Sequence, residues 1–363
     1  MTAVVLQLLH MRLTEKLLKN SSQSKVAESI SLLPEQLKQV LADLADYQLP
    51  KNYRQINRIV VAGMGGSNLA GRIAASVFAE DLAVPLLVCA DYELPAFVDR
   101  ETLVVLSSYS GNTEETLAAA VEAEKRNAKI LVITASSKNN KLANAMISRH
   151  WPGYLFTADD NPSGQPRLAL GYALFGLLVL LAKLDVINLP KNLAEFIIDL
   201  TDAGQRLILP SLANPAVKIA RAAKGKQLVL VGGEFLAGNL HAWRNQCNET
   251  AKNFATYLVL PDLNHYALEG LKFPSANKKD VLFIFIDSVL YSPRVQKRSL
   301  LTQSVVKKNQ IKSYAHQLKG KTKLAQSLEL LQLGAWMTFY LAQENKADPS
   351  KIPFVDWFKS QLK

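Results

Sequence analysis

The sequence predicts an α/β protein made of two doubly wound parallel-sheet domains in tandem, with flanking helices. Short runs rich in Val, Ile and Leu alternate with segments of helical spacing along the 363 residues. The runs are apolar throughout, as expected for parallel strands that helices cover on both faces. The same order of elements then occurs a second time. This repetition lies in the pattern and is weak in the residues themselves.

The first half contains four predicted strands and two predicted helices. The strands are the apolar runs at 56–62, 85–89, 102–106 and 129–133. Helical spacing covers 67–78 and 114–126. Thr113 precedes two acidic residues of the second helix, so we expect it to be the N-cap.

The second half repeats this order. Its predicted strands are 227–231, 257–260 and 281–286, and its predicted helices are 236–252 and 324–342. The longest apolar run, 168–182, is shorter than the roughly 18 to 20 residues of a membrane span and is expected to be a buried helix. No membrane partner is therefore expected.

Composition and pattern divide the chain into five segments. Residues 1–20 carry no basic leader and no small-residue cleavage site, so no secretory signal is expected. The segments are an N-terminal helical segment 1–50, a first domain 51–186, linker helices 187–215, a second domain 216–345 and a C-terminal helical tail 346–363.

Charge and cysteine content narrow the class of function. The net charge of +11 fits an anionic metabolite, a nucleic acid or solubility alone. The basic residues are spread along the chain without an aromatic-interleaved motif, so no nucleic-acid partner is expected. Cys89 and Cys247 form neither a disulfide framework nor a zinc-ligand spacing, which favours a reducing, cytoplasmic location.

A glycine-rich loop, "GMGGSNLAG", follows the first strand at 63–71. Its glycines allow backbone N–H groups to approach an anion at the start of a helix. Asn68 stands where a dinucleotide fingerprint requires a third glycine, and the Walker lysine is missing. Asp91, at the end of the second strand, is placed to bind a ribose, so the sequence does not exclude a nucleotide site. Tight packing of strand on helix explains the loop equally well.

The stretch "LSSYSGNTEETL" at 106–117 follows the third strand and is rich in hydroxyl groups. Both loops leave carboxyl ends of parallel strands, where ligands bind in such sheets. The hydroxyls and amides gathered there suit a phosphate dianion without any lysine. The expected phosphate ligands are Gly66, Ser67, Ser108, Ser110 and Thr113. A polar capping turn would explain Thr113 and leave the serines unused.

"GMGGS" together with "SYSGNTEETL" resembles the bifunctional phosphoglucose/phosphomannose isomerases, which contain two sugar isomerase (SIS) domains of flavodoxin-like fold. The runs "LPEQLKQVLADL" and "GQPRLALGYALFGLL" are also similar to that family. The resemblance implies interconversion of glucose 6-phosphate and mannose 6-phosphate with fructose 6-phosphate through a cis-enediol. It also implies a homodimer that needs no metal or other cofactor.

The resemblance implies four catalytic residues. Glu249 in "NETAKN" matches the base that moves the proton. His265 in "LNHY" matches a histidine that assists ring opening from the partner subunit. Arg167 matches an arginine that stabilises the enediolate, and Lys359 matches an active-site lysine of the tail. By themselves these residues read as ordinary surface, loop or helix-flanking groups.

Four positions depart from the family pattern: Arg72, Asp262, Tyr266 and Ala335. None of them is an expected catalytic residue, but they leave the balance between glucose and mannose substrates open. Two alternatives remain beside the isomerase. One is a phosphosugar-binding sensor without turnover, and the other is a dinucleotide-dependent enzyme, against which Asn68 argues.

Overall fold

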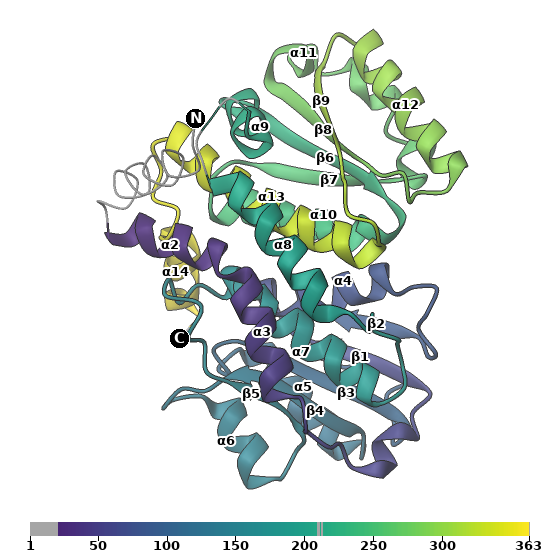
Figure 1. Cartoon of the computed structure of the whole chain (residues 1–363), viewed down its shortest axis with the longest axis vertical. Helices are drawn as coiled ribbons and strands as arrows, with labels where there is room; N and C mark the ends of the chain where they lie inside the picture. The colour runs from purple at the N-terminus through teal and green to yellow at the C-terminus, as the bar shows by residue number, and fades with distance from the viewer. Residues whose placement is uncertain (1–20, 209–210, 212, 363) are drawn as a thin grey trace.

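Figure 1 shows the computed structural model, which describes residues 21–208, 211 and 213–362. The expected absence of a secretory signal and the start of the N-terminal helical segment fall on residues 1–20, outside the described residues. The boundaries drawn between the five segments stay predictions.

The first sheet is parallel and has the strand order β2-β1-β3-β4-β5. The chain turns to opposite sides of the sheet on leaving β1 and β3, and such a switch point is where ligands bind in open α/β sheets. The strands are β1 (Arg58–Ala62), β2 (Leu86–Cys89), β3 (Thr102–Ser108), β4 (Lys129–Ala135) and β5 (Gly153–Phe156). Its helices are α4 (Leu69–Val77), α5 (Glu114–Lys125), α6 (Lys141–Ser148) and α7 (Leu170–Lys183).

The second sheet is also parallel and has the corresponding order β7-β6-β8-β9. The prediction of two doubly wound parallel-sheet domains is therefore confirmed. The strands are β6 (Gln227–Gly233), β7 (Ala255–Leu260), β8 (Val281–Asp287) and β9 (Lys312–Gln317). The helices are α9 (Pro215–Ala223), α10 (Ala237–Glu249), α11 (Asn277–Asp280), α12 (Pro293–Lys308) and α13 (Lys323–Glu344).

Several elements differ from the prediction for physical reasons. Strand β9 was not predicted because it is a largely exposed edge strand of polar sequence, KSYAHQ. The helix predicted at 67–78 begins instead with a 3₁₀ turn at Gly65–Asn68. The helix predicted to run to 252 ends at Glu249, since Lys252 adopts a left-handed backbone with φ of 51°.

Long helices join the two sheets into one body (Figure 1). The apolar run at 168–182 forms α7, whose side chains are largely buried, as predicted. Helices α4 and α10 pack against each other between the sheets, and α13 contacts both of them. Further helices are α2 (Ser21–Ser31), α3 (Leu33–Asp43), α8 (Leu193–Ile208) and α14 (Pro353–Gln361). In the described part of the chain, no helix has the length and apolarity needed to cross a membrane.

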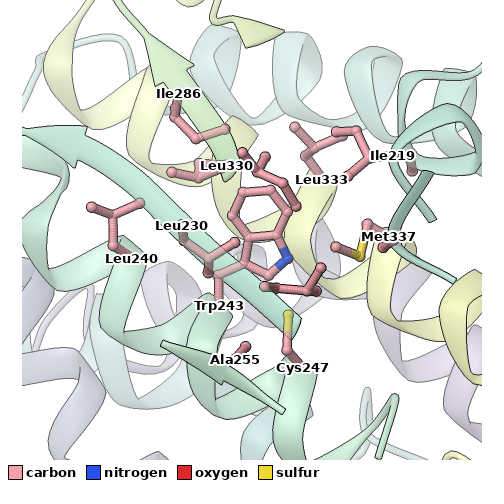
Figure 2. Packing of buried hydrophobic residues seen from close by; sticks show 14 of the residues in the cluster. Ile219, Leu230, Leu240, Trp243, Cys247, Ala255, Ile286, Leu330, Leu333 and Met337 are labelled. Atoms are coloured by element: carbon pink, nitrogen blue, oxygen red, sulfur yellow. The ribbon is translucent and has the colours of Figure 1, made fainter. Parts of the chain in front are cut away.

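The core of the second domain holds α10 in place (Figure 2). Trp243 and Cys247 of α10 are fully buried beside Leu230 of β6 and Met337 of α13. Gly334 admits the indole, because a Cβ there would lie 2.8 Å from Cδ1 of Trp243. Such close packing holds α10 in one position, so the backbone of Glu249 at its end is fixed as well.

Candidate active site

The two hydroxyl-rich loops lie side by side at the carboxyl ends of β1 and β3. Ala62 and Leu106 are paired in the sheet, so both strands end at the same edge. The Ser67 hydroxyl accepts a hydrogen bond from the backbone N–H of Tyr109 at 3.1 Å, and Ser107 donates to the Ser67 carbonyl at 2.8 Å. These two bonds join the loops into one surface.

Ser108 and Thr113 form the centre of this surface. Their hydroxyl oxygens are 2.9 Å apart, and the Ser108 oxygen also accepts from the Gly111 N–H. Thr113 does occupy the N-cap position of α5, but its side chain makes no capping bond, so the expected capping role of the hydroxyl is wrong. The exposed Ser110 accepts from the Asn112 N–H at 3.3 Å. The hydroxyls are thus arranged around the helix start, where an anion is favoured.

Gly111 fixes the shape of the second loop. It has a φ of +64°, and a Cβ there would lie 1.6 Å from Oδ1 of Asn140. Asn140 donates to the Thr134 hydroxyl at 2.7 Å, and Thr134 donates to the Ser108 carbonyl at 2.6 Å. All three polar groups are buried and satisfied, so the loop is held rigidly against β4.

A cavity of about 10 Å³ lies beneath the loops. It is large enough for a water molecule and far too small for a sugar phosphate. Ser110 lies on the outer side of the loops, where it is exposed. The lining residues are Gly66, Ser67, Ser107, Tyr109, Ile133, Phe156, Pro166, Ala169 and Ala173.

Arg167 and Glu249 come together from the two halves of the chain. Nη1 of Arg167 lies 3.6 Å from Oε2 of Glu249. The arginine side chain is 2% exposed and the glutamate 32% exposed. Burial lowers the pKa of Arg167, and the nearby Glu249 opposes that shift. The guanidinium remains charged, as arginine does in proteins.

The guanidinium of Arg167 is held by four further hydrogen bonds, the longest of which runs from Nη2 to the Ser350 carbonyl at 3.3 Å. Nε donates to Thr250 Oγ1 at 3.0 Å, Nη1 to Gln165 Oε1 at 2.8 Å, and Nη2 to the Pro349 carbonyl at 2.7 Å. Since Thr250 and Pro349 occupy Nε and Nη2, Nη1 is the nitrogen that faces Glu249. The planar group has five donors, so one N–H of Nη1 stays available beyond Gln165.

The glycine-rich loop at 63–71 lies against the segment that carries Arg167. A Cβ on Gly66 would come within 3.3 Å of the backbone nitrogen of Arg167 and the carbonyl carbon of Pro166. The hydroxyl loops, the guanidinium and the carboxylate are therefore adjacent in space. Such an arrangement of hydroxyl-rich loops, a buried cation and an accessible carboxylate suits proton transfer on a phosphorylated molecule.

His265 and Lys359 are not part of this arrangement within one chain. Both are exposed, and in the described residues no hydrogen bond or ion pair joins either to Arg167 or Glu249. His265 ends the 3₁₀ turn Asp262–His265, whose Asn264 donates to Thr302 of α12 at 2.8 Å. Lys359 lies on α14, which buries none of its residues.

Three neighbours of the pair were missed by the sequence analysis: Gln165, Thr250 and Lys252. Lys252 donates to the Glu249 carbonyl at 2.8 Å, and burial, together with Arg167, lowers the pKa of its ammonium to about 8. Thr250 and Lys252 lie in the quoted string "NETAKN". Only the three-dimensional structure shows that Thr250 contacts Arg167 and that Lys252 contacts the end of α10.

The described residues contain no group of three or more His, Cys, Asp or Glu side chains placed to hold a metal ion. The two cysteines are buried free thiols, and burial raises the pKa of both. The polar groups at the site are therefore hydroxyls, amides, Arg167, Glu249 and Lys252.

Comparison with known proteins extends these observations. Residues 52–148 match the SIS domain family, and residues 212–362 match the bacterial phospho-glucose isomerase C-terminal SIS domain. The bifunctional phosphoglucose/phosphomannose isomerase of Caldicellulosiruptor bescii is 31% identical over 354 residues, covering 92% of this chain and 98% of the relative. The protein of the same description from Aquifex aeolicus is 31% identical over 319 residues, covering 87% and 93%.

A solved structure of a hypothetical protein from Thermus thermophilus has the same fold, with a TM-score of 0.73 and 17% identity. It covers 99% of this chain and 94% of its own. The fold and the matched domains define a sugar-phosphate isomerase built from two SIS domains. The chain belongs to the bifunctional phosphoglucose/phosphomannose isomerase family. The predicted fold class, family and isomerase class are confirmed, and the sensor alternative is not favoured.

Proposed function

We propose that this protein interconverts fructose 6-phosphate with glucose 6-phosphate and with mannose 6-phosphate through a cis-enediol. The observation that carries the proposal is the contact of 3.6 Å between Arg167 and Glu249 beside the phosphate loops. A base and a cation at this spacing can take a proton from carbon and stabilise the negative oxygen that develops.

The phosphate of the substrate binds to the backbone of Gly66 and to the hydroxyls of Ser67, Ser108, Ser110 and Thr113. Two of these hydroxyls, Ser108 and Thr113, are already 2.9 Å apart, which supports their convergence on one ligand oxygen. Anchoring the phosphate places the other end of an opened sugar toward Arg167 and Glu249. Such positioning contributes a large part of the rate in isomerisation of this kind.

Glu249 takes the proton from C1 of fructose 6-phosphate and returns it to C2, so that no atom is gained or lost. The electron pair of the C–H bond passes into the C1–C2 double bond of the enediolate, and the C2 oxygen takes up the negative charge. The proton of the C1 hydroxyl then passes to the C2 oxygen, so that C1 becomes the aldehyde carbonyl when C2 is protonated. Nη1 of Arg167 donates to the enediolate oxygens. Protonation of C2 from one face gives glucose 6-phosphate, and protonation from the other face gives mannose 6-phosphate.

The site is completed in a homodimer, in which His265 of one chain reaches the site of the other. Lys359 and His265 open the sugar ring. The exposure of both residues supports this proposal, as does α14, whose Phe354, Trp357 and Phe358 are 86%, 63% and 57% exposed. Arg167 also holds the Pro349 carbonyl, so the tail that carries Lys359 starts beside the catalytic pair.

A mixing experiment tests the shared site. Glu249→Gln and His265→Gln are each expected to be inactive as homodimers. Mixed dimers formed by unfolding and refolding the two together contain one site with both native residues, so activity should return. Activity that does not return would mean that His265 acts within its own chain or takes no part.

The activity itself is tested with fructose 6-phosphate in the presence of EDTA, with glucose 6-phosphate and mannose 6-phosphate assayed separately. Formation of both products is expected, and product from one aldose alone would narrow the proposal to that substrate. Thermal stabilisation by fructose 6-phosphate without any product would instead favour the sensor.

A cytoplasmic location is part of the proposal and is consistent with two free thiols.

A further inference from the structure

A second polar cluster lies on α10 toward the opposite end from Glu249. It consists of His241 and Arg244 of α10, Tyr257 of β7, and Arg72 of α4. The Arg72 backbone lies against α10, because a Cβ on Gly238 would be 2.4 Å from the Arg72 carbonyl oxygen. His241 precedes Glu249 by eight residues of helix, or roughly 12 Å at the usual rise per residue. The cluster is therefore separate from the site of proton transfer.

The hydrogen bonds of this cluster fix the state of His241. Nη2 of Arg244 lies 2.9 Å from Nε2 of His241, and an arginine can only donate, so Nε2 accepts. The imidazole is then neutral and carries its proton on Nδ1, which lies 3.1 Å from the Tyr257 hydroxyl and donates to it. Burial, Arg244 and Arg72 lower the pKa of His241 to about 4, in agreement with a neutral ring.

The cluster has an excess of donors. Because the Tyr257 oxygen accepts from His241, its own O–H points away, and no acceptor for it is found among the described residues. Nε of Arg72 is buried without a hydrogen-bond partner. The guanidinium of Arg244 also lies 5.5 Å from the centre of the Tyr257 ring. Neither arginine forms an ion pair within residues 21–208, 211 and 213–362.

Partly buried cations without a counter-charge are costly, and an unmatched buried donor adds to that cost. Within these four residues the unsatisfied groups are Nε of Arg72 and the O–H of Tyr257, and both are donors. Nε of Arg244 donates to Oδ1 of Asn245 at 2.8 Å. A ligand that supplies only acceptor oxygens and negative charge would satisfy them together. Guanidinium groups bind phosphate through two parallel hydrogen bonds, which makes a phosphoryl group the best match.

We propose that Arg72, His241, Arg244 and Tyr257 form a second anion site, which binds inorganic phosphate or the phosphoryl group of a small metabolite. This site is independent of the loops that are proposed to hold the phosphate of the substrate. Arg72 and Arg244 supply the charge, and the Tyr257 hydroxyl donates a hydrogen bond. His241 orients that hydroxyl by donating to its oxygen.

The test is calorimetric titration of the full-length protein with inorganic phosphate. The background variant is Ser108→Ala with Thr113→Val, which weakens the proposed substrate-phosphate site. Phosphate is expected to bind this background with one site per chain, and Arg244→Gln or Arg72→Gln added to it should weaken that binding at least tenfold. Arg221→Gln is the charge-matched control, since Arg221 is exposed and lies near Glu344 instead.

Tyr257→Phe removes one hydroxyl and keeps the ring, so it guards against variants that fail to fold. It should weaken phosphate binding several-fold without changing the melting temperature by much. The proposal is overturned if the background variant binds no phosphate, or if Arg244→Gln and Arg221→Gln bind it equally well. It is also overturned if Arg244→Gln leaves phosphate affinity unchanged but dissociates an oligomer in sedimentation, because the cluster would then pair with a carboxylate of a second copy.

Discussion

Nη1 of Arg167 lies 3.6 Å from Oε2 of Glu249. The arginine side chain is buried, whereas the glutamate side chain is about one-third exposed. The buried member is fixed by Thr250, Gln165 and Pro349, so it defines where the exposed carboxylate rests. The carboxylate itself keeps access to solvent and to a ligand. This asymmetry gives each residue a different expected response to substitution.

Arg167→Lys is expected to lower kcat by about a hundredfold, because a lysine ammonium cannot keep three directed bonds and face the enediolate at once. The same substitution should lower the free energy of unfolding by about 2 kcal/mol, since buried acceptors lose their donors. Steady-state kinetics and chemical denaturation measure the two effects. Arg221→Lys is the exposed control, and an unchanged kcat in Arg167→Lys would remove the arginine from the mechanism.

Thr113→Val should raise KM for fructose 6-phosphate about tenfold, which corresponds to the loss of one hydrogen bond to a charged group. Stability should fall by no more than the loss of the bond to the Ser108 hydroxyl, about 1 kcal/mol, because the Thr113 hydroxyl does not cap α5. Thr201→Val is a matched control, since that hydroxyl bonds only to the Ile197 carbonyl of its own helix. A drop in stability with no change in KM would show that Thr113 has a structural role.

Gly66→Ala and Gly65→Ala form a pair that separates geometry from backbone strain. At Gly66 the new Cβ lies 3.3 Å from the Arg167 segment, so the phosphate loop must move away and kcat/KM is expected to fall about tenfold. At Gly65 the space is open but φ is +52°, so the expected effect is about 1 kcal/mol of stability. Kinetics and melting curves of both variants check this. Equal loss of activity in the two would contradict it.

His241 should make the protein less stable as the pH falls. Its pKa is about 4 in the folded chain against an ordinary value of 6.5. Between these values the unfolded chain binds a proton that the folded chain does not, so stability is present above pH 6.5 and is lost on acidification toward pH 4. With allowance for partial solvent exposure, we expect about 1 kcal/mol from this residue. His241→Gln should flatten the fall relative to the wild type, and parallel curves would contradict the assignment.

The sequence was most informative where structure is local. Continuous apolar runs such as 102–106 identified buried strands, and the loops that follow them could be placed at one sheet edge because parallel strands end together. The exposed strand β9 gave no such signal, since neither of its faces forms an apolar row.

The contacts of Arg167 could not be predicted because they join segments distant in the chain. Thr250 and Pro349 reach it from the end of α10 and from the start of the tail.

Position 72 was recognised as a departure from the family pattern. Its environment depends on the packing of α4 against α10, which brings the Arg72 backbone next to Gly238. Local patterns therefore located the hydroxyl loops, and tertiary packing determined the rest of the site.

The central claim is that Glu249 moves the proton between the carbons of a phosphate-anchored sugar. The most direct measurement is incubation of fructose 6-phosphate with the protein in D₂O, with deuterium at C1 followed by NMR. Wild-type protein should exchange hydrogen at C1 for deuterium as it forms aldose. Glu249→Gln should bind fructose 6-phosphate normally but lose both exchange and product formation by at least about a thousandfold. Exchange or product at the wild-type rate in Glu249→Gln would contradict the claim.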